Sequence, residues 1–199
     1  MNMQSILISS VLQVIIFSAV PVVWWAATAR KENSFFQWIG LKKPIFANKR
    51  HLIIVLGAAV LVSVLMQLII PRLVEMDTTA VSPFIDQGFA ALVPALIFSF
   101  VTTGLSEEIL FRGFLGKRLI AQHGFSTGNF VQALIFGMIH GVLSMSRVRI
   151  FPALLLVLIT GAAGWVMGYV NERLAGGSIV PSWLIHGIAN MISALMVMF

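Results

Sequence analysis

Long apolar runs alternate with short polar segments along the whole chain. The first run covers residues 4–29, and the second covers residues 52–70, where Pro71 ends it. A helix needs roughly 20 apolar residues to cross a bilayer. The pattern therefore predicts two membrane-spanning helices. The first run is long and follows no basic residue, which favours a span over a cleavable signal peptide.

A third apolar element extends from about residue 88 to about residue 121 without a polar break. A straight helix of this length measures roughly 50 Å, whereas the hydrocarbon core is about 30 Å thick. We expect one long helix that bends near Pro94 or Gly104 and ends at Lys117 and Arg118. The alternative is a hairpin that breaks near Gly104.

Three further apolar runs follow, at residues 128–145, 150–170 and 178–198. The sequence therefore predicts an all-α fold, a polytopic membrane helix bundle of about six transmembrane helices. The number becomes seven if the long element is two helices.

Composition agrees with a membrane protein. Of 199 residues, 59% are hydrophobic and 10% are charged, whereas soluble domains carry about 25% charged residues. The net charge of +6 would suggest a nucleic-acid partner for a soluble protein. Here we assign the excess to loops beside anionic headgroups and expect no nucleic-acid partner. The absence of cysteine excludes disulfides, thiolate metal sites and a cysteine nucleophile.

Loop charges give the chain an expected orientation. The loop at residues 30–51 holds six Lys and Arg residues against one acidic residue, and the loop at 71–87 holds three acidic residues against one Arg. The positive-inside rule then places residues 30–51 in the cytoplasm and residues 71–87 outside. Arg147 and Arg149 would also lie outside, which is the main argument against six spans.

Three charged residues, Glu107, Glu108 and Arg112, interrupt the long element at membrane depth. Ionisable side chains there cost several kcal/mol and usually mark function. Glu108 and Arg112 have the i, i+4 spacing of a favourable helical ion pair. Glu107 is rotated by about 100° from Glu108, so its partner must come from another helix.

Candidate partners for Glu107 lie on later spans. His140 follows Phe136 by four residues, and His186 and Asn190 have the same spacing, so each pair shares a helix face. In the six-span arrangement the four polar residues fall roughly 12–21 Å from the cytoplasmic ends of their helices. We therefore expect them to converge.

This set of side chains has the groups that peptide-bond hydrolysis requires. A carboxylate beside a neutral histidine can take a proton from water, while a second histidine and a carboxamide can stabilise an oxyanion. Two glutamates and two histidines could instead bind zinc. The HExxH signature is absent and Asn190 is a poor zinc ligand. We expect no metal or other cofactor and retain a zinc-dependent protease as the weaker alternative.

Three short motifs complete the sequence pattern: Glu107-Glu108-x-x-x-Arg112, Phe136-x-x-x-His140 and His186-x-x-x-Asn190. Together they resemble the CAAX protease and bacteriocin-processing family (CPBP, or Abi), intramembrane glutamic endopeptidases that include type II CAAX prenyl endopeptidases. The resemblance covers roughly residues 85–198. It suggests two parts: residues 1–84, two N-terminal transmembrane helices with a basic cytoplasmic loop, and residues 85–199, a CPBP-like catalytic core.

The resemblance also implies roles for individual residues. Glu107 and His140 would activate water, His186 with Asn190 would form the oxyanion site, and Glu108, Arg112 and Phe136 would support them. It implies a cavity that opens toward the cytoplasm, a location in the plasma membrane, and membrane-associated proteins or peptides as substrates.

Other interpretations remain open. The carboxylates could form a buried ion-pair cluster that only holds helices together, although one Arg cannot serve two acids at low cost. The protein could be a non-catalytic membrane regulator or scaffold, for example of the immunity type. A small transporter is less favoured, because no related halves are visible. Ser106, Ser178 and Ser182 lack a nucleophile context, and we interpret them as packing or capping residues.

Overall fold

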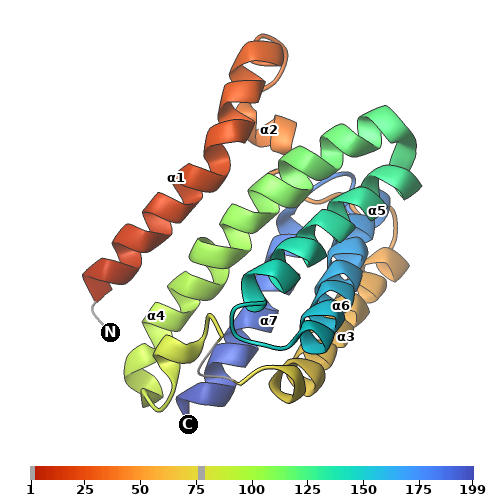
Figure 1. Ribbon diagram of the computed structural model, residues 1–199. Coiled ribbons are helices and arrows are strands. Elements are labelled where there is room, and N and C mark those ends of the chain that lie inside the picture. Colours follow the sequence, from red (N-terminus) through yellow and green to blue (C-terminus); the bar gives the residue numbers. More distant parts are fainter. Residues whose placement is uncertain (1–2, 76–78) are drawn as a thin grey trace.

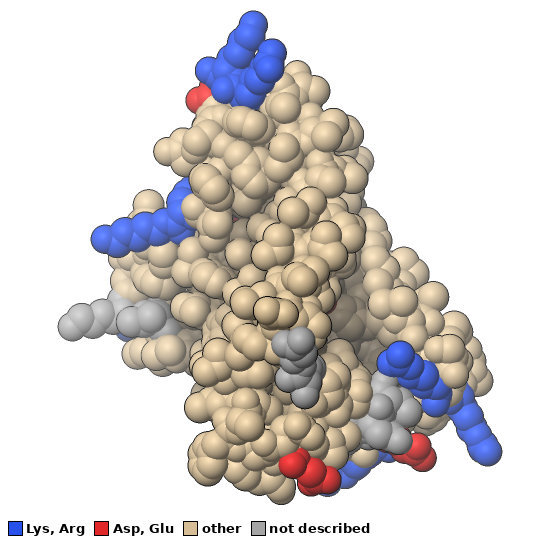
Figure 2. Space-filling model, turned by 90° about the vertical axis from the view of Figure 1, so that its left-hand side faces the viewer, with Lys and Arg blue, Asp and Glu red and all other residues tan. Residues whose placement is uncertain are grey.

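The computed structural model describes residues 3–75 and 79–199, and these residues form a bundle of helices without any strand (Figure 1). The prediction of an all-α, polytopic membrane bundle is confirmed. Apolar side chains such as Val23 and Ile53 are largely exposed on the outer helices. Charged side chains gather at the extremities of the molecule, and uncharged residues cover most of the surface between them (Figure 2). This is the surface expected of a bundle that faces hydrocarbon.

The main helices are α1 (Met3–Thr28), α3 (Lys49–Leu73), α5 (Lys117–Ser144), α6 (Ile150–Tyr169) and α7 (Val180–Met198). Shorter elements are α2 (Phe35–Ile39), η2 (Ser82–Phe84), η3 (Gly88–Ala91) and α4 (Leu92–Ile97). Three π-helical segments complete the order: η4 (Phe98–Leu105), η5 (Glu108–Gly116) and η6 (Val170–Leu174).

Five helical stretches of the described residues are long and apolar enough to cross a membrane, and one of them, Gly88–Ser144, counts 57 residues. This stretch reverses direction at Gly124, whose φ of 76° and ψ of 166° are not helical. Figure 1 shows its first arm rising along the bundle and its second arm returning beside it. With this reversal, the five stretches of the described residues make six passes along the bundle. The start of α1 and the end of α7 lie at the same end of the bundle (Figure 1).

The backbone stays helical through Gly104, so the long element is one rod and not the hairpin considered as an alternative. On both sides of Ser106 and Glu107 it adopts the wider π-helical turn. The Thr103 hydroxyl donates to the Phe98 carbonyl, five residues back, at 3.1 Å. Such π-helical turns are frequent at functional sites, and here they bracket Glu107.

The start of α7 is fixed by the loop that follows α2. The Ile179 amide donates to the Gly40 carbonyl at 2.8 Å, and the Ser178 hydroxyl donates to the Lys42 carbonyl at 2.5 Å. Lys117 Nζ donates to the Gly177 carbonyl and to Glu172, both at 2.7 Å. These contacts set the position of α7, which carries His186 and Asn190.

The N-terminal helices pack on both sides of the later ones. Ser10 of α1 shares a hydrogen bond of 2.6 Å with Thr102, and Gln67 of α3 donates to Ser193 of α7 at 2.6 Å. Residues 1–84 therefore contribute to the surroundings of the core, and their separation from residues 85–199 stays a prediction.

Candidate active site

One carboxylate faces two imidazole rings at the place where the long element, α5 and α7 meet. Glu107 Oε2 lies 3.8 Å from Nε2 of His140 and 3.8 Å from Nε2 of His186. This oxygen is buried, and within the described residues it has no direct hydrogen-bond partner. The helical spacing predicts this convergence, and the structure brings the three residues together.

The two distances are too long for direct hydrogen bonds, which span about 2.7–3.2 Å. They suit one water molecule that contacts all three atoms, because a water 2.8 Å from each of two atoms can span up to about 5.6 Å between them. The site is therefore wide enough for a water between Glu107 and each histidine.

Glu108 lies in a separate, fully buried network next to Glu107. Its Oε1 is 3.2 Å from Arg112 Nη1 and 3.1 Å from His186 Nδ1, and its Oε2 accepts from the Ser182 hydroxyl at 2.5 Å. Asn171 Nδ2 donates to the Ser182 hydroxyl at 2.7 Å. The i, i+4 ion pair expected from sequence is present. Both carboxylate oxygens of Glu108 therefore have partners within the protein.

The hydrogen bonds of the histidines determine which nitrogen faces Glu107. His140 Nδ1 lies 2.8 Å from the Phe136 carbonyl, and His186 Nδ1 lies 3.1 Å from the Glu108 carboxylate. The Phe136 carbonyl is an acceptor only, and so is the Glu108 carboxylate in its ionised form. Both Nδ1 atoms therefore carry the hydrogen of these bonds. Each ring therefore turns its Nε2 toward Glu107.

The Phe136 ring separates the charged groups from the remainder of the core. It is buried, its centroid is 4.4 Å from that of His140, and the Arg112 guanidinium carbon lies 4.0 Å above it. A guanidinium at this distance is attracted to the ring face. Phe136 thus contacts both Arg112 and His140.

Asn190 lies on the same face of α7 as His186, but its amide contacts a different partner. Asn190 Nδ2 donates to Thr103 Oγ1 at 2.7 Å. An amide nitrogen carries two hydrogens, so the second one is available to a substrate.

A cavity of about 420 Å³ adjoins these residues. Its wall includes Glu107, His140, His186 and Asn190 together with mostly apolar side chains from α3, α5, α6 and α7. The volume is within the range of small-molecule pockets.

Sequence reasoning missed three residues at the site: Ser182, Asn171 and Thr103. Ser182 was interpreted as a packing or capping residue, whereas it donates to Glu108. Its place four residues before His186 was a usable signal, because residues at this spacing share a helix face. Asn171 and Thr103 gave no comparable signal.

Among the described residues, no group of three or more His, Cys, Asp or Glu side chains has an arrangement suited to a metal ion. Arg112, His186 and Ser182 contact the Glu108 oxygens, so Glu108 is committed to protein partners.

The model of one protein family, described as Type II CAAX prenyl endopeptidase Rce1-like, matches residues 89–192. No curated protein and no solved structure matches the chain. The matched segment begins in η3 and ends in α7, so it includes every site residue named above.

Proposed function

Since the chain belongs to the family of Rce1-like type II CAAX prenyl endopeptidases, we propose that Glu107 and its two histidines hydrolyse peptide bonds with an activated water. Family membership makes the chain a CAAX-type intramembrane protease in general terms. The glutamate mechanism is the further step, and one observation supports it most: Glu107 Oε2 lies 3.8 Å from both Nε2 atoms.

The proposed mechanism assigns a charge to each polar group of the site. In this mechanism Glu107 and Glu108 both act as carboxylates, while Arg112 supplies one positive charge. Uncompensated charge in a buried site costs several kcal/mol, so a second cation is needed. His186 suits this role because its Nδ1 already donates to Glu108. A protonated His186 then offers Nε2–H as a donor toward the cavity.

The reaction would begin with water held between Glu107 and His140. Glu107 takes one proton from this water, and His140 accepts a hydrogen bond through Nε2, which orients the remaining hydroxide. The hydroxide attacks the carbonyl carbon of the substrate peptide bond and forms a tetrahedral intermediate. The intermediate then collapses, the C–N bond breaks, and the proton passes from Glu107 to the leaving amine.

The oxyanion of that intermediate would be stabilised by two donors. His186 Nε2–H is one, and the free hydrogen of the Asn190 amide is the other. Thr103 holds Asn190 in place through its hydroxyl. Preorganised donors of this kind stabilise a transition state by about 3–4 kcal/mol each.

In this proposal the protein resides in the plasma membrane with the 30–51 loop in the cytoplasm. Its substrates are membrane-associated proteins or peptides, and it needs no metal. The mostly apolar cavity wall supports a substrate segment with apolar side chains.

The proposal is tested by comparing membrane-associated and secreted peptides from cells that express wild-type protein or Glu107→Gln at equal abundance. Glu32→Gln is the matched control, because Glu32 is exposed in the loop after α1. New peptide termini that occur with wild-type and Glu32→Gln, but not with Glu107→Gln, are the expected result. Identical profiles in all three, together with a cellular phenotype that survives Glu107→Gln, would point to a non-catalytic membrane regulator.

A further inference from the structure

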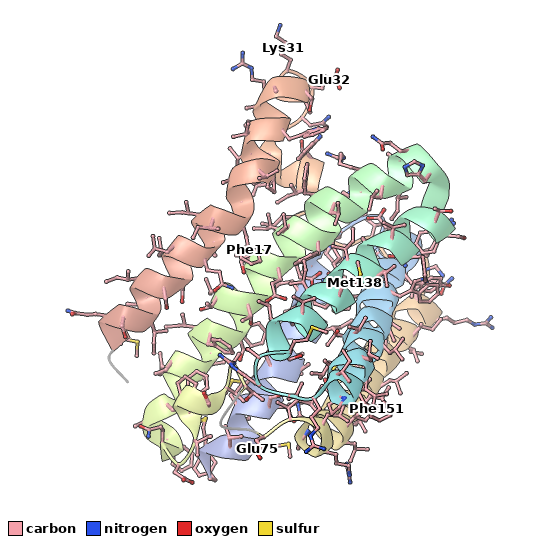
Figure 3. All side chains as sticks on the ribbon, viewed as in Figure 1. Phe17, Lys31, Glu32, Glu75, Met138 and Phe151 are labelled. Carbon is pink, nitrogen blue, oxygen red and sulfur yellow. The ribbon has the colours of Figure 1, made fainter. Side chains whose placement is uncertain are left out.

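Asn171 is a buried polar residue that the mechanism above does not use. It lies in η6, directly after α6, with an exposed fraction of 1%. Phe151 lies near the start of α6, at the end of the bundle that carries Glu75 (Figure 3), so η6 lies toward the other end. A buried amide needs partners for both its oxygen and its nitrogen. The partners of Asn171 come from the first turn of α7 and the loop before it.

The backbone of Asn171 ties the end of η6 to this loop. Its carbonyl accepts from the Gly177 amide, six residues later, at 2.8 Å. Gly176 and Gly177 have positive φ values of 64° and 75°, as in the glycine-terminated helix ends that use this kind of bond. The tight turn brings the Asn171 side chain within reach of the first turn of α7.

The Asn171 amide contacts Ser182 at two points. Its Oδ1 accepts from the backbone N–H of Ser182 at 3.2 Å, and its Nδ2 donates to the Ser182 hydroxyl at 2.7 Å. A backbone N–H can only donate, so the amide oxygen must face it and the NH2 group must face the hydroxyl. The orientation of the Asn171 amide is therefore determined by its contacts.

This orientation decides where the Ser182 hydroxyl donates. Its oxygen accepts from Asn171, so its single hydrogen is available to another group. Two acceptors are within reach: Glu108 Oε2 at 2.5 Å and the Ile179 carbonyl at 3.0 Å. The carboxylate is nearer, and hydrogen bonds to charged acceptors are roughly twice as strong. The hydroxyl therefore donates to Glu108, whose Oε1 lies 3.1 Å from His186 Nδ1.

We propose that Asn171 is a positioning residue for Glu107-dependent hydrolysis. It turns the Ser182 hydroxyl toward Glu108, and Glu108 in turn orients the ring of His186. The inference rests on the proposed function and adds one residue to it. Because Asn171 acts on the reaction through Ser182, its effect should disappear when residue 182 lacks a hydroxyl.

The variant Asn171→Asp separates this role from a purely structural one. A carboxylate keeps the acceptor for the Ser182 N–H, and negative charge near the start of a helix is stabilising. If Asn171 only held α7 in place, this change would have little effect. An ionised carboxylate, however, can only accept from the Ser182 hydroxyl. The hydroxyl then donates to the new carboxylate instead of Glu108, and the rate of hydrolysis falls.

The kinetic test uses full-length protein in lipid vesicles and a peptide identified by the cellular comparison. We expect Asn171→Asp to lower kcat about 10- to 100-fold with KM nearly unchanged, as for the loss of one partner of a buried hydrogen bond. In protein that already carries Ser182→Ala, the same change should lower kcat less than about threefold, because residues of one hydrogen-bond network are not additive.

Asn129→Asp is the matched control. Asn129 is also buried, with an exposed fraction of 0%, and its Nδ2 donates to the Trp165 carbonyl at 3.0 Å between α5 and α6. Both variants place a carboxylate where a buried amide donates, but they differ in their link to Ser182. An equal fall of kcat in both variants would overturn the inference. An unchanged kcat in Asn171→Asp, or an equal fall with and without the Ser182 hydroxyl, would do the same.

A second measurement needs no substrate. In protein whose histidines carry a nitrogen isotope, the NMR signal of His186 Nδ1 reports its contact with Glu108, and His186→Gln identifies this signal. We expect Asn171→Asp to move the signal and Asn129→Asp to leave it in place. Asn171→Leu buries no charge and serves if Asn171→Asp does not fold. It removes the donor to Ser182 and should also move the signal, whereas Asn129→Leu should not.

The two measurements separate this inference from the proposed function. If the wild-type protein cleaves no peptide, the proposed function fails, and the His186 signal alone decides whether Asn171 orients the ring. If the wild-type protein cleaves, an unmoved signal in Asn171→Asp and Asn171→Leu leaves the hydrolysis standing and removes the role of Asn171.

Discussion

Glu108 contacts Nδ1 of His186 at 3.1 Å, while the neighbouring Glu107 faces Nε2 of the same ring at 3.8 Å. Adjacent glutamates thus contact opposite sides of one imidazole. Glu108 is also held by Arg112 and Ser182, whereas Glu107 lines the cavity and its Oε2 has no direct partner among the described residues. The arrangement separates a carboxylate that orients the histidine from one that can act on water.

His140 should be essential for the rate of hydrolysis. In His140→Ala the water next to Glu107 loses its second partner, and the rate constant should fall about 10²- to 10⁴-fold, the usual contribution of a positioned acid–base group. His123→Ala is the matched control, because His123 is exposed near the Gly124 turn. The measurement is cleavage of a peptide identified by the cellular comparison, by purified protein in lipid vesicles. An equal loss in both variants would contradict the assignment.

Ser182 should act through Glu108 and His186. Ser182→Ala removes a donor to Glu108 and leaves both that carboxylate oxygen and Asn171 Nδ2 without their present partner. Loss of one partner of a buried hydrogen bond costs about 1–3 kcal/mol. We expect kcat to fall with KM nearly unchanged, and Ser182→Thr, which keeps a hydroxyl, to restore part of kcat. A raised KM with an unchanged kcat would mean that Ser182 serves substrate binding instead.

Gly40 should be needed for the placement of α7. Its φ is +82°, and a Cβ there would collide with the Gly177 carbonyl and lie 2.6 Å from Lys117 Cε. Gly40→Ala should therefore lower the midpoint of thermal unfolding, with a cost of about 1–3 kcal/mol from a strained backbone position.

The matched control for this change is Gly57→Ala, because a Cβ on Gly57 meets no atom within 4 Å. Gly57 lies inside α3, where Ala is favoured over Gly by up to about 1 kcal/mol. The two glycine variants should shift the unfolding midpoint in opposite directions, as measured in detergent micelles. A Gly40→Ala protein as stable as wild type would contradict the role assigned to this loop.

The metal-free mechanism predicts that chelators leave activity unchanged. After treatment with EDTA or phenanthroline and removal of the chelator, peptide cleavage should proceed at the original rate. Loss of cleavage that added zinc restores would favour the zinc-dependent alternative.

The sequence was sufficient for the spans, the Glu108–Arg112 pair and the convergence of Glu107 with the two histidines. These features follow from local rules: apolar length sets the spans, and the 3.6-residue period sets the helix faces. Contacts such as the hydrogen bond from Asn171 to Ser182 could not be predicted from the sequence, because they depend on how separate helices pack. The π-helical turns around Glu107 were also not foreseen, since no residue type specifies them.

The location of the cavity was a second feature that the sequence could not give. Its position depends on which neighbours of the site are large or paired, as Phe136 and Arg112 are, and which are small, as Ser144 is.

The most direct test of the central claim is the rate at which purified Glu107→Gln cleaves a peptide that the wild-type protein cleaves, both in lipid vesicles. The account predicts a loss of at least about 10³-fold, because Gln cannot take a proton from water, with thermal unfolding close to that of wild type. Cleavage by Glu107→Gln at the wild-type rate would contradict it.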